Sequence, residues 1–248
     1  MPHKTYTAPE PVTPKTPEER IPRQFISFAF YKLDPAWRHL PEEEKAKGRQ
    51  EWLDVVHKYQ EQGMIVRSFS LTGIRADHDI LLWRIDYKLE NMQQMQAEFY
   101  STGLGKYLLP SLHYLSMSKR STYVDKVNPA HDHKRSLVQP ARRKYLFVYP
   151  FVKTREWYLL HETTRQGMMD EHITEGMKFP TVKLNTTYSF GIDDQDFVVA
   201  FETDYPEDFV DLLMKMRETD ASRYTLRDTP FHTCIQGTLE EVLDTLGK

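Results

Sequence analysis

One short stretch of the sequence, residues 149–176, gathers four side chains that could do redox or metal chemistry. It reads YPFVKTREWYLLHETTRQGMMDEHITEG and contains Tyr149, Lys153, Trp157 and His172. A phenol can give up an electron and a proton, an ammonium can hold a carboxylate by a charge-assisted hydrogen bond, and a neutral imidazole can bind a metal. The question is whether these groups act on one ligand.

Tyr149 and Lys153 are four residues apart at the end of an expected strand. Side chains alternate along a strand, so both residues are expected on the same face. A tyrosine and a lysine facing one cavity suit a ligand that has carboxylates and takes part in electron or proton transfer. The alternative is a rim tyrosine beside a lysine whose stem lies on apolar surface.

His172 ends a segment with helical spacing, residues 156–172. In one helix, a single face would contain Trp157, Leu160, Thr164, Met168 and His172. From periodicity alone, a histidine on an apolar face is more often a satisfied core residue than a ligand. Both interpretations stay open at this point.

Composition describes a globular chain of 248 residues, 40% of them hydrophobic, with a net charge of −3. This charge gives no whole-protein attraction to nucleic acid or to anionic membranes. The single cysteine, Cys234, cannot form an internal disulfide, so a reducing compartment is expected. No apolar run approaches the ~20 residues of a membrane span, and no signal peptide is evident. We therefore expect a cytoplasmic protein.

The elements that position these residues occur twice. FISFAFYKLDPAWRHL at 25–40 matches YLFVYPFVKTREWYLL at 145–160, and Gly73-Ile74 precedes Gly191-Ile192 by 118 residues. In the second copy we expect strands at 144–153, 181–190, 196–203 and 231–237, and helices at 156–172 and 206–219. The order βαββαβ is that of the ferredoxin-like unit.

The predicted fold class is therefore α+β, with two tandem ferredoxin-like units in an arrangement like a dimeric α/β-barrel. The expected organisation is an extended proline-rich arm (1–22), an N-terminal unit (23–120), a linker (121–143) and a C-terminal unit (144–248).

The second half resembles the chlorite dismutase-like haem proteins, and among them the coproheme decarboxylases of the actinobacterial type. The resemblance rests on YPFVKTREWYLL, the EH pair at 171–172, NTTYSFGIDDQDFVVAFETD, MKMRETDASRY and DTPFHT. It covers residues 145–237 well, and the first half only by fold and length. It implies that haem is bound by the second unit alone and that the chain forms a homo-oligomer, a pentamer.

Position by position, the resemblance makes His172 the proximal haem ligand. Tyr149 matches the tyrosine that the decarboxylases use as a radical, and Lys153 the lysine near a propionate. Trp157 matches the tryptophan that follows in the same motif. Asp220 matches an acidic residue that hydrogen-bonds the proximal histidine, which would fix its tautomer and raise its basicity.

For the distal side of the iron, opposite the proximal histidine, the sequence offers several candidate residues. Chlorite dismutases have a distal arginine where this chain has Leu184, which lacks the charge to hold a chlorine oxyanion, so chlorite breakdown is disfavoured. Alignment on Pro129-Ala130 places Val127 at the distal histidine of the decarboxylases, and His131 and His133 are the alternatives. Arg142 and Arg143 are candidate propionate clamps or simply a solvated basic pair.

The resemblance implies hydrogen peroxide-dependent oxidative decarboxylation of iron-coproporphyrin III (coproheme) to haem b, a step of haem biosynthesis. The haem would be both cofactor and substrate, and the porphyrin and peroxide the small-molecule partners. The competing hypotheses are a haem-binding or haem-sensing protein and a weak peroxidase. Tyr149 and Lys153 favour decarboxylation, whereas the lack of a clear distal base favours the alternatives.

Overall fold

The computed structural model describes residues 22–121, 123 and 137–247. The expected arm, except its last residue, and the candidate distal residues Val127, His131 and His133 lie outside these ranges. The first half contains β1 (Phe25–Leu33), α1 (Glu42–Glu61), β2 (Ile65–Ser70), β3 (Ile80–Asp86), α2 (Leu89–Tyr100) and β4 (Leu108–Met117). This order is βαββαβ, as predicted.

The second half repeats this order with additions. It contains β5 (Tyr145–Lys153), α3 (Arg155–Leu159), α4 (Glu162–Gly176), β6 (Lys183–Tyr188), β7 (Phe197–Thr203), α5 (Pro206–Glu218), β8 (Thr225–Arg227), β9 (His232–Gly237) and α6 (Leu239–Asp244). Short 3-10 helices lie at Pro35–His39, Leu104–Lys106 and Asp220–Tyr224 (η5). Within the described ranges, no helix has the length and apolarity that a membrane span requires.

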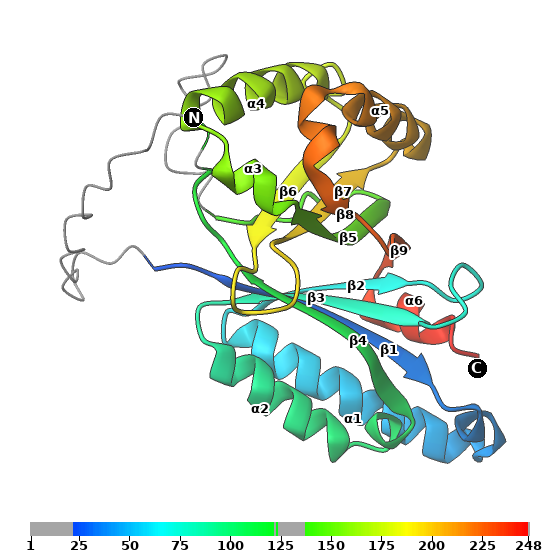
Figure 1. The fold of residues 1–248 in the computed structure, drawn as a ribbon. Helices are drawn as coiled ribbons and strands as arrows, with labels where there is room; N and C mark the ends of the chain where they lie inside the picture. Colours follow the sequence, from blue (N-terminus) through cyan, green and yellow to red (C-terminus); the bar gives the residue numbers. More distant parts are fainter. Residues whose placement is uncertain (1–21, 122, 124–136, 248) are drawn as a thin grey trace.

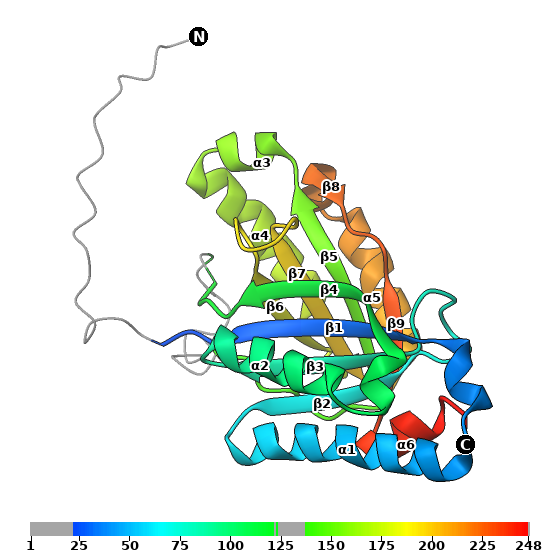
Figure 2. The ribbon, with the colours of Figure 1, turned by 90° about the horizontal axis from the view of Figure 1, so that it is seen from below.

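The two sheets join along both edges. The strand order is β4-β1-β3-β2 in the first unit and β9-β5-β7-β6 in the second. Strand β2 pairs with β9 from Ser68 to Ser70, and β4 meets β6 at Met117 and Tyr188. Eight strands therefore close into one barrel, which Figure 2 shows from the side of β1 and β4. This confirms the predicted fold class of two ferredoxin-like units in a barrel-like arrangement.

Strand alternation divides the apolar residues into three clusters. The barrel interior contains Leu146 and Val148 of β5 together with Phe28 and Trp83 of the first unit. The outer face of the first sheet packs under α1 and α2, and that of the second sheet packs under α5. In Figure 1, α1 and α2 cover one side of the barrel, and α4 and α5 lie on the opposite side. Alternation also places Phe147 and Tyr149 on the outer face of the second sheet.

Equivalent helices of the two units differ in what they bury. In the first unit, α1 buries Trp52, Leu53, Val56 and Tyr59 against its sheet. In the second unit, α4 has no buried residue along its whole length. The main contacts of α4 are with α5 and with η5. The second unit therefore lacks, under α4, the packing between helix and sheet that α1 makes in the first unit.

The prediction of one helix over residues 156–172 is wrong. The chain leaves the helical conformation at Leu160 (φ −65°, ψ 150°), and α4 begins after His161. The His161 side chain accepts a hydrogen bond from the Thr163 N–H, which is the hydrogen bond of an N-cap. Trp157 and His172 therefore belong to different helices, α3 and α4, and do not share a helix face.

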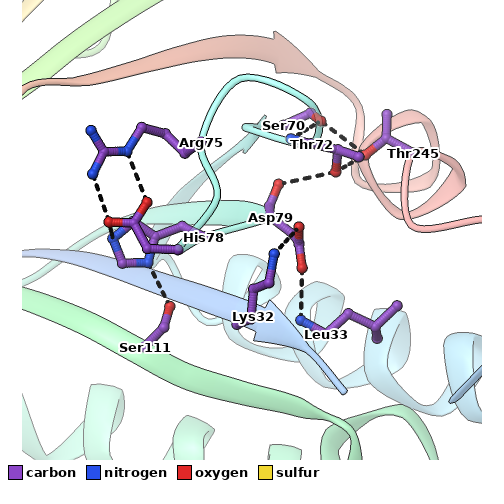
Figure 3. Close-up of polar contacts among 10 residues, drawn as sticks. Lys32, Leu33, Ser70, Thr72, Arg75, His78, Asp79, Ser111 and Thr245 are labelled. Carbon is purple, nitrogen blue, oxygen red and sulfur yellow. Dashed lines mark hydrogen bonds and ion pairs between the residues drawn. The ribbon is translucent and has the colours of Figure 1, made fainter. Parts of the chain in front are cut away.

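The C-terminal helix α6 packs on the first unit rather than the second. Leu239, Val242 and Leu243 belong to the cluster under α1 and α2. Just after α6, the Thr245 hydroxyl lies 2.9 Å from the Ser70 hydroxyl and 3.2 Å from that of Thr72 (Figure 3). The core of the first unit is thus completed by residues from beyond β9.

Candidate functional site

The strand register places two of the predicted site residues, Tyr149 and Leu184, on one face of the second sheet. Along the outer face of the second sheet, Tyr149 of β5 is opposite Val199 of β7, and Val199 is opposite Thr186 of β6. The next row is Phe147, Phe201 and Leu184. Leu184 is 50% exposed although its strand lies inside the sheet. No side chain of α4 is buried opposite it, so this part of the outer face is left uncovered.

Tyr149 is a buried residue of this outer face. Its side chain is 4% exposed, and its ring is 4.2 Å from that of Phe231. Burial raises the pKa of the Tyr149 phenol, and the nearby Asp228 raises it further against the opposing charge of Arg217. The phenol is therefore neutral at physiological pH. If it loses an electron, it must also lose its proton, because the charged form is strongly disfavoured here.

Lys153 is the cationic group of the site. Its Nζ donates a hydrogen bond of 2.6 Å to the Ala221 carbonyl oxygen and lies 4.5 Å from the centre of the Trp157 ring. Burial lowers the pKa of Lys153 to about 8. Within the described residues, its ammonium has no carboxylate partner. A partly buried cation without a carboxylate partner can bind an anionic group of a ligand.

His172 lies on α4 close enough to Lys153 for their charges to interact. The His172 ring is half-buried, and this partial burial, followed by the charge of Lys153, lowers its pKa to about 4. The imidazole is therefore neutral at pH 7, which is the form that binds metals. Its Nδ1 is buried and has no hydrogen-bond partner among the described residues. The core histidine His232 also has a buried Nδ1 without a partner, so this feature is shared by a core histidine and by a histidine that could bind a ligand.

The hydrogen bond expected between Asp220 and His172 is not formed. The Asp220 carboxylate is exposed, 3.9 Å from Arg223. Its position is nevertheless beside α4, because the Asp220 N–H donates to the Glu171 carboxylate at 3.0 Å. The reason is that η5 begins at Asp220, so that its side chain points toward the next turn of η5 rather than toward α4.

The structure does not bring Arg142 and Arg143 to this site, which corrects their interpretation as clamps. They precede β5, and Lys153 ends it, so the length of the strand separates them, about 26 Å at ~3.3 Å per residue. Arg143 pairs with Asp204 at 2.8 Å. Both arginines line a different groove, beside Arg67.

Three features of the site had no role in the sequence prediction. Thr186 is exposed in the row of Tyr149, and alternation along 181–190 could have identified it. Phe231 covers the Tyr149 ring, and Asp228 sets its electrostatic surroundings. Both belong to the DTPFHT segment, whose strand β9 pairs with β5 only in the folded chain.

A metal at His172 would obtain few ligands from the protein. Among the described residues, no group of three or more histidine, cysteine, aspartate or glutamate side chains could hold an ion. A single imidazole suits a metal whose other ligands come with it, as in a macrocycle. The donor set, with one neutral imidazole, one cation and one buried phenol, is suited to a metal macrocycle that has acidic substituents.

Comparison with known proteins agrees with this fold. A protein-family model described as chlorite dismutase matches residues 18–237. A coproheme decarboxylase from Mycolicibacterium smegmatis is 29% identical over 225 residues, which are 90% of this chain and 94% of that protein. A chlorite dismutase from Ideonella dechloratans is 25% identical over 211 residues, 83% of this chain and 73% of that protein. The structure of a mutant chlorite dismutase from Candidatus Nitrospira defluvii, 26% identical, gives a TM-score of 0.83 and covers 91% of this chain and 96% of that one.

Proposed function

Because the chain belongs to the chlorite dismutase family, we propose that it binds an iron porphyrin between α4 and the outer face of its second sheet. We further propose that it decarboxylates iron-coproporphyrin III oxidatively, with hydrogen peroxide as the oxidant. The observation that supports this most directly is the contrast between α1, which buries four side chains at its sheet, and α4, which buries none. The face left uncovered includes Leu184 and lies opposite the helix that contains His172.

The residues present fit such a group. The imidazole of His172 is neutral at pH 7, so one of its ring nitrogens could bind the iron. If Nε2 were that nitrogen, the buried Nδ1 could donate to a carboxylate, and Asp220 is the candidate because its N–H already donates to Glu171 beside His172. When bound, the iron would supply the redox chemistry that activates peroxide.

Lys153 would bind one carboxylate of the porphyrin. Its ammonium would exchange the Ala221 carbonyl for a carboxylate oxygen, which is a stronger acceptor. The incoming negative charge would raise the lysine pKa from about 8 and keep the group protonated. Trp157, under the ammonium at 4.5 Å, limits its movement. Lys153 is therefore proposed as an orienting residue and not as a proton donor.

Tyr149 would be the redox-active side chain. Its phenol would release an electron and a proton together, since burial disfavours the phenolate. The resulting radical would take a hydrogen atom from the β-carbon of a propionate. Loss of carbon dioxide and of one further electron then leaves a vinyl group, so that each propionate that reacts loses two electrons in total and peroxide accepts them.

The proposal includes the homopentamer expected from the resemblance.

Leu184 argues against chlorite as the substrate. It is half-exposed on the outer face and offers neither charge nor hydrogen-bond donor to an oxyanion. The candidate distal bases Val127, His131 and His133 lie outside the described residues. We therefore keep a haem-binding protein without turnover as the competing outcome of the experiment.

The test replaces Tyr149 by phenylalanine. The protein is mixed with iron-coproporphyrin III and peroxide, and the monovinyl and divinyl products are measured by mass spectrometry. Tyr149→Phe removes one hydroxyl, which contributes about 1 kcal/mol to stability, so folding and porphyrin affinity should change little. Product formation should nevertheless be almost lost, with Lys153→Ala intermediate between it and the wild type.

Tyr145→Phe is the matched control, because Tyr145 lies on the same strand and packs against the same cluster. Its turnover should equal that of the wild type. Equal turnover in the wild type and Tyr149→Phe would refute the radical role. If the wild type and all variants bind the porphyrin and none forms product, the haem-binding interpretation replaces the enzyme.

A further inference from the structure

The first unit contains a buried arginine that the proposed function does not use. Arg84 lies on the outer face of β3 and is 4% exposed. Its Nη2 donates to the Ser27 hydroxyl at 2.9 Å, its Nε to the same oxygen at 3.3 Å, and its Nη1 to the Met92 carbonyl oxygen at 3.5 Å. A guanidinium has five N–H donors, so two neutral oxygens do not satisfy it.

No carboxylate of the described residues is paired with this charge. Among the described residues, Arg84 forms no ion pair. The nearest acid along the same strand face, Asp86, accepts hydrogen bonds from the Lys88 N–H and the Asn91 side chain instead. An arginine cannot lose its proton to escape the cost of burial, which amounts to several kcal/mol for an unpaired ion. Arg84 is therefore a buried cation that is available to an anionic ligand.

A cavity leads to this arginine from the surface. It has a volume of about 680 Å³, lies between α2 and the strands β1 and β4, and has Arg84 in its lining. Ligand pockets commonly measure about 300–1,000 Å³. Most of the lining is apolar and includes Ala29, Met92, Ala97 and Leu112. A ligand that fills this space needs an apolar body.

The polar groups around the cavity restrict the ligand further. The Tyr31 hydroxyl is already used by the Gln96 side chain at 2.6 Å, and His113 is paired with Ser27 at 2.6 Å. Glu90 also lines the cavity and is exposed, so every negative charge beyond the one that Arg84 balances is unfavourable there. One buried cation balances one negative charge, so a monocarboxylate fits better than a phosphate or a dicarboxylate. A carboxylate also matches the planar fork of a guanidinium.

We propose that this cavity binds an amphipathic monocarboxylate, whose carboxylate pairs with Arg84 and whose apolar body lies between α2 and β4. The site belongs to the first unit and lies on the opposite side of the barrel from His172. It is independent of the iron porphyrin and of the proposed decarboxylation.

The test titrates the full chain with decanoate by calorimetry. The cation decyltrimethylammonium, which has the same alkyl chain, and acetate, which has the charge alone, serve as comparison ligands. Decanoate should bind with one site per chain, and the other two should not. Arg84→Gln should weaken decanoate binding at least tenfold, which corresponds to 1.4 kcal/mol. Arg67→Gln, at an arginine of the neighbouring strand outside the cavity, should leave the affinity unchanged.

A second variant protects the test against misfolding of Arg84→Gln. Ala97→Trp fills the mouth from an exposed position of α2 and leaves Arg84 intact, so it should abolish binding in a folded protein. Absence of decanoate binding to the wild type, or equal affinity in the wild type and both variants, would overturn the proposal. If decanoate fails to bind and Ala97→Trp lowers the mass of an oligomer in light scattering, a second copy of the chain covers the cavity.

Discussion

Replacing Lys153 by methionine should make the ligand-free protein more stable and the porphyrin complex weaker. The change keeps an unbranched side chain of similar length and removes the buried charge. Burial lowers the lysine pKa from 10.5 to about 8, so that folding at neutral pH imposes a desolvation cost of at most about 3 kcal/mol. The hydrogen bond to Ala221 and the contact with the Trp157 ring offset about 2 kcal/mol of this cost. The expected net gain for Lys153→Met at pH 7 is therefore about 1 kcal/mol.

The pH dependence gives the sign of this effect independently. Between pH 8 and 10.5, the unfolded chain holds the lysine proton more tightly than the native chain does, so wild-type stability contributed by this group rises with pH. At pH 9.5 the rise amounts to about 2 kcal/mol, calculated from the two pKa values. Lys153→Met should thus be more stable than the wild type at pH 7 and less stable at pH 9.5.

Urea unfolding followed by tryptophan fluorescence at both pH values measures this crossing. Lys215→Met, at an exposed lysine of α5, is the control and should show no crossing. Titration with iron-coproporphyrin III should give an affinity at least tenfold lower for Lys153→Met, because a charge-assisted hydrogen bond contributes about 1.5–3 kcal/mol. A variant that is less stable than the wild type at pH 7 and parallel to it at pH 9.5 would refute the reasoning.

Two further changes test separate parts of the structure. His172→Ala should leave the thermal melting temperature of the ligand-free chain within a few degrees of wild type, since the imidazole Nδ1 has no partner to lose among the described residues. The variant should also abolish the histidine-ligated absorption spectrum of added iron porphyrin. An unchanged spectrum would contradict the role of His172 as ligand. Glu202→Gln should lower the free energy of unfolding by about 2–4 kcal/mol. The reason is that this buried carboxylate accepts hydrogen bonds from the N–H groups of Ala141 and Arg142 and from the Asn185 side chain. An unshifted urea midpoint would show that the glutamine amide replaces the carboxylate fully.

Local alternation made the strands predictable from the sequence. The expected strand 144–153 is observed as Tyr145–Lys153, and the expected helix 206–219 as Pro206–Glu218. Side chains on a strand must alternate between the barrel interior and the outer face, so this pattern is visible in the residues themselves. The same rule predicts that Tyr149 and Lys153 share a face, and this stays a prediction because the pairing of β5 with β8 shifts register between Val152 and Lys153.

The break between α3 and α4 could not be read from spacing. Leu160 and His161 fit a helix, and neither glycine nor proline marks the interruption. The helix α6 did have a local signal, since Thr238 and Glu241 form a capping box before an apolar run. No local signal showed that α6 packs on the first unit, because this packing depends on pairing between β2 and β9, which are far apart in the sequence. The location of Arg142 and Arg143 likewise depends on contacts between segments that are far apart in the sequence.

The packing of α6 on the first unit has a consequence for synthesis of the chain. The side chains of Leu239, Val242, Leu243 and Leu246 complete a hydrophobic core whose other buried members lie between residues 29 and 108. A ribosome releases these segments in order, so the N-terminal half emerges with an incomplete core and must wait for the last helix. During translation its exposed apolar surface is available to chaperones, and the first unit matures only after the second has been made.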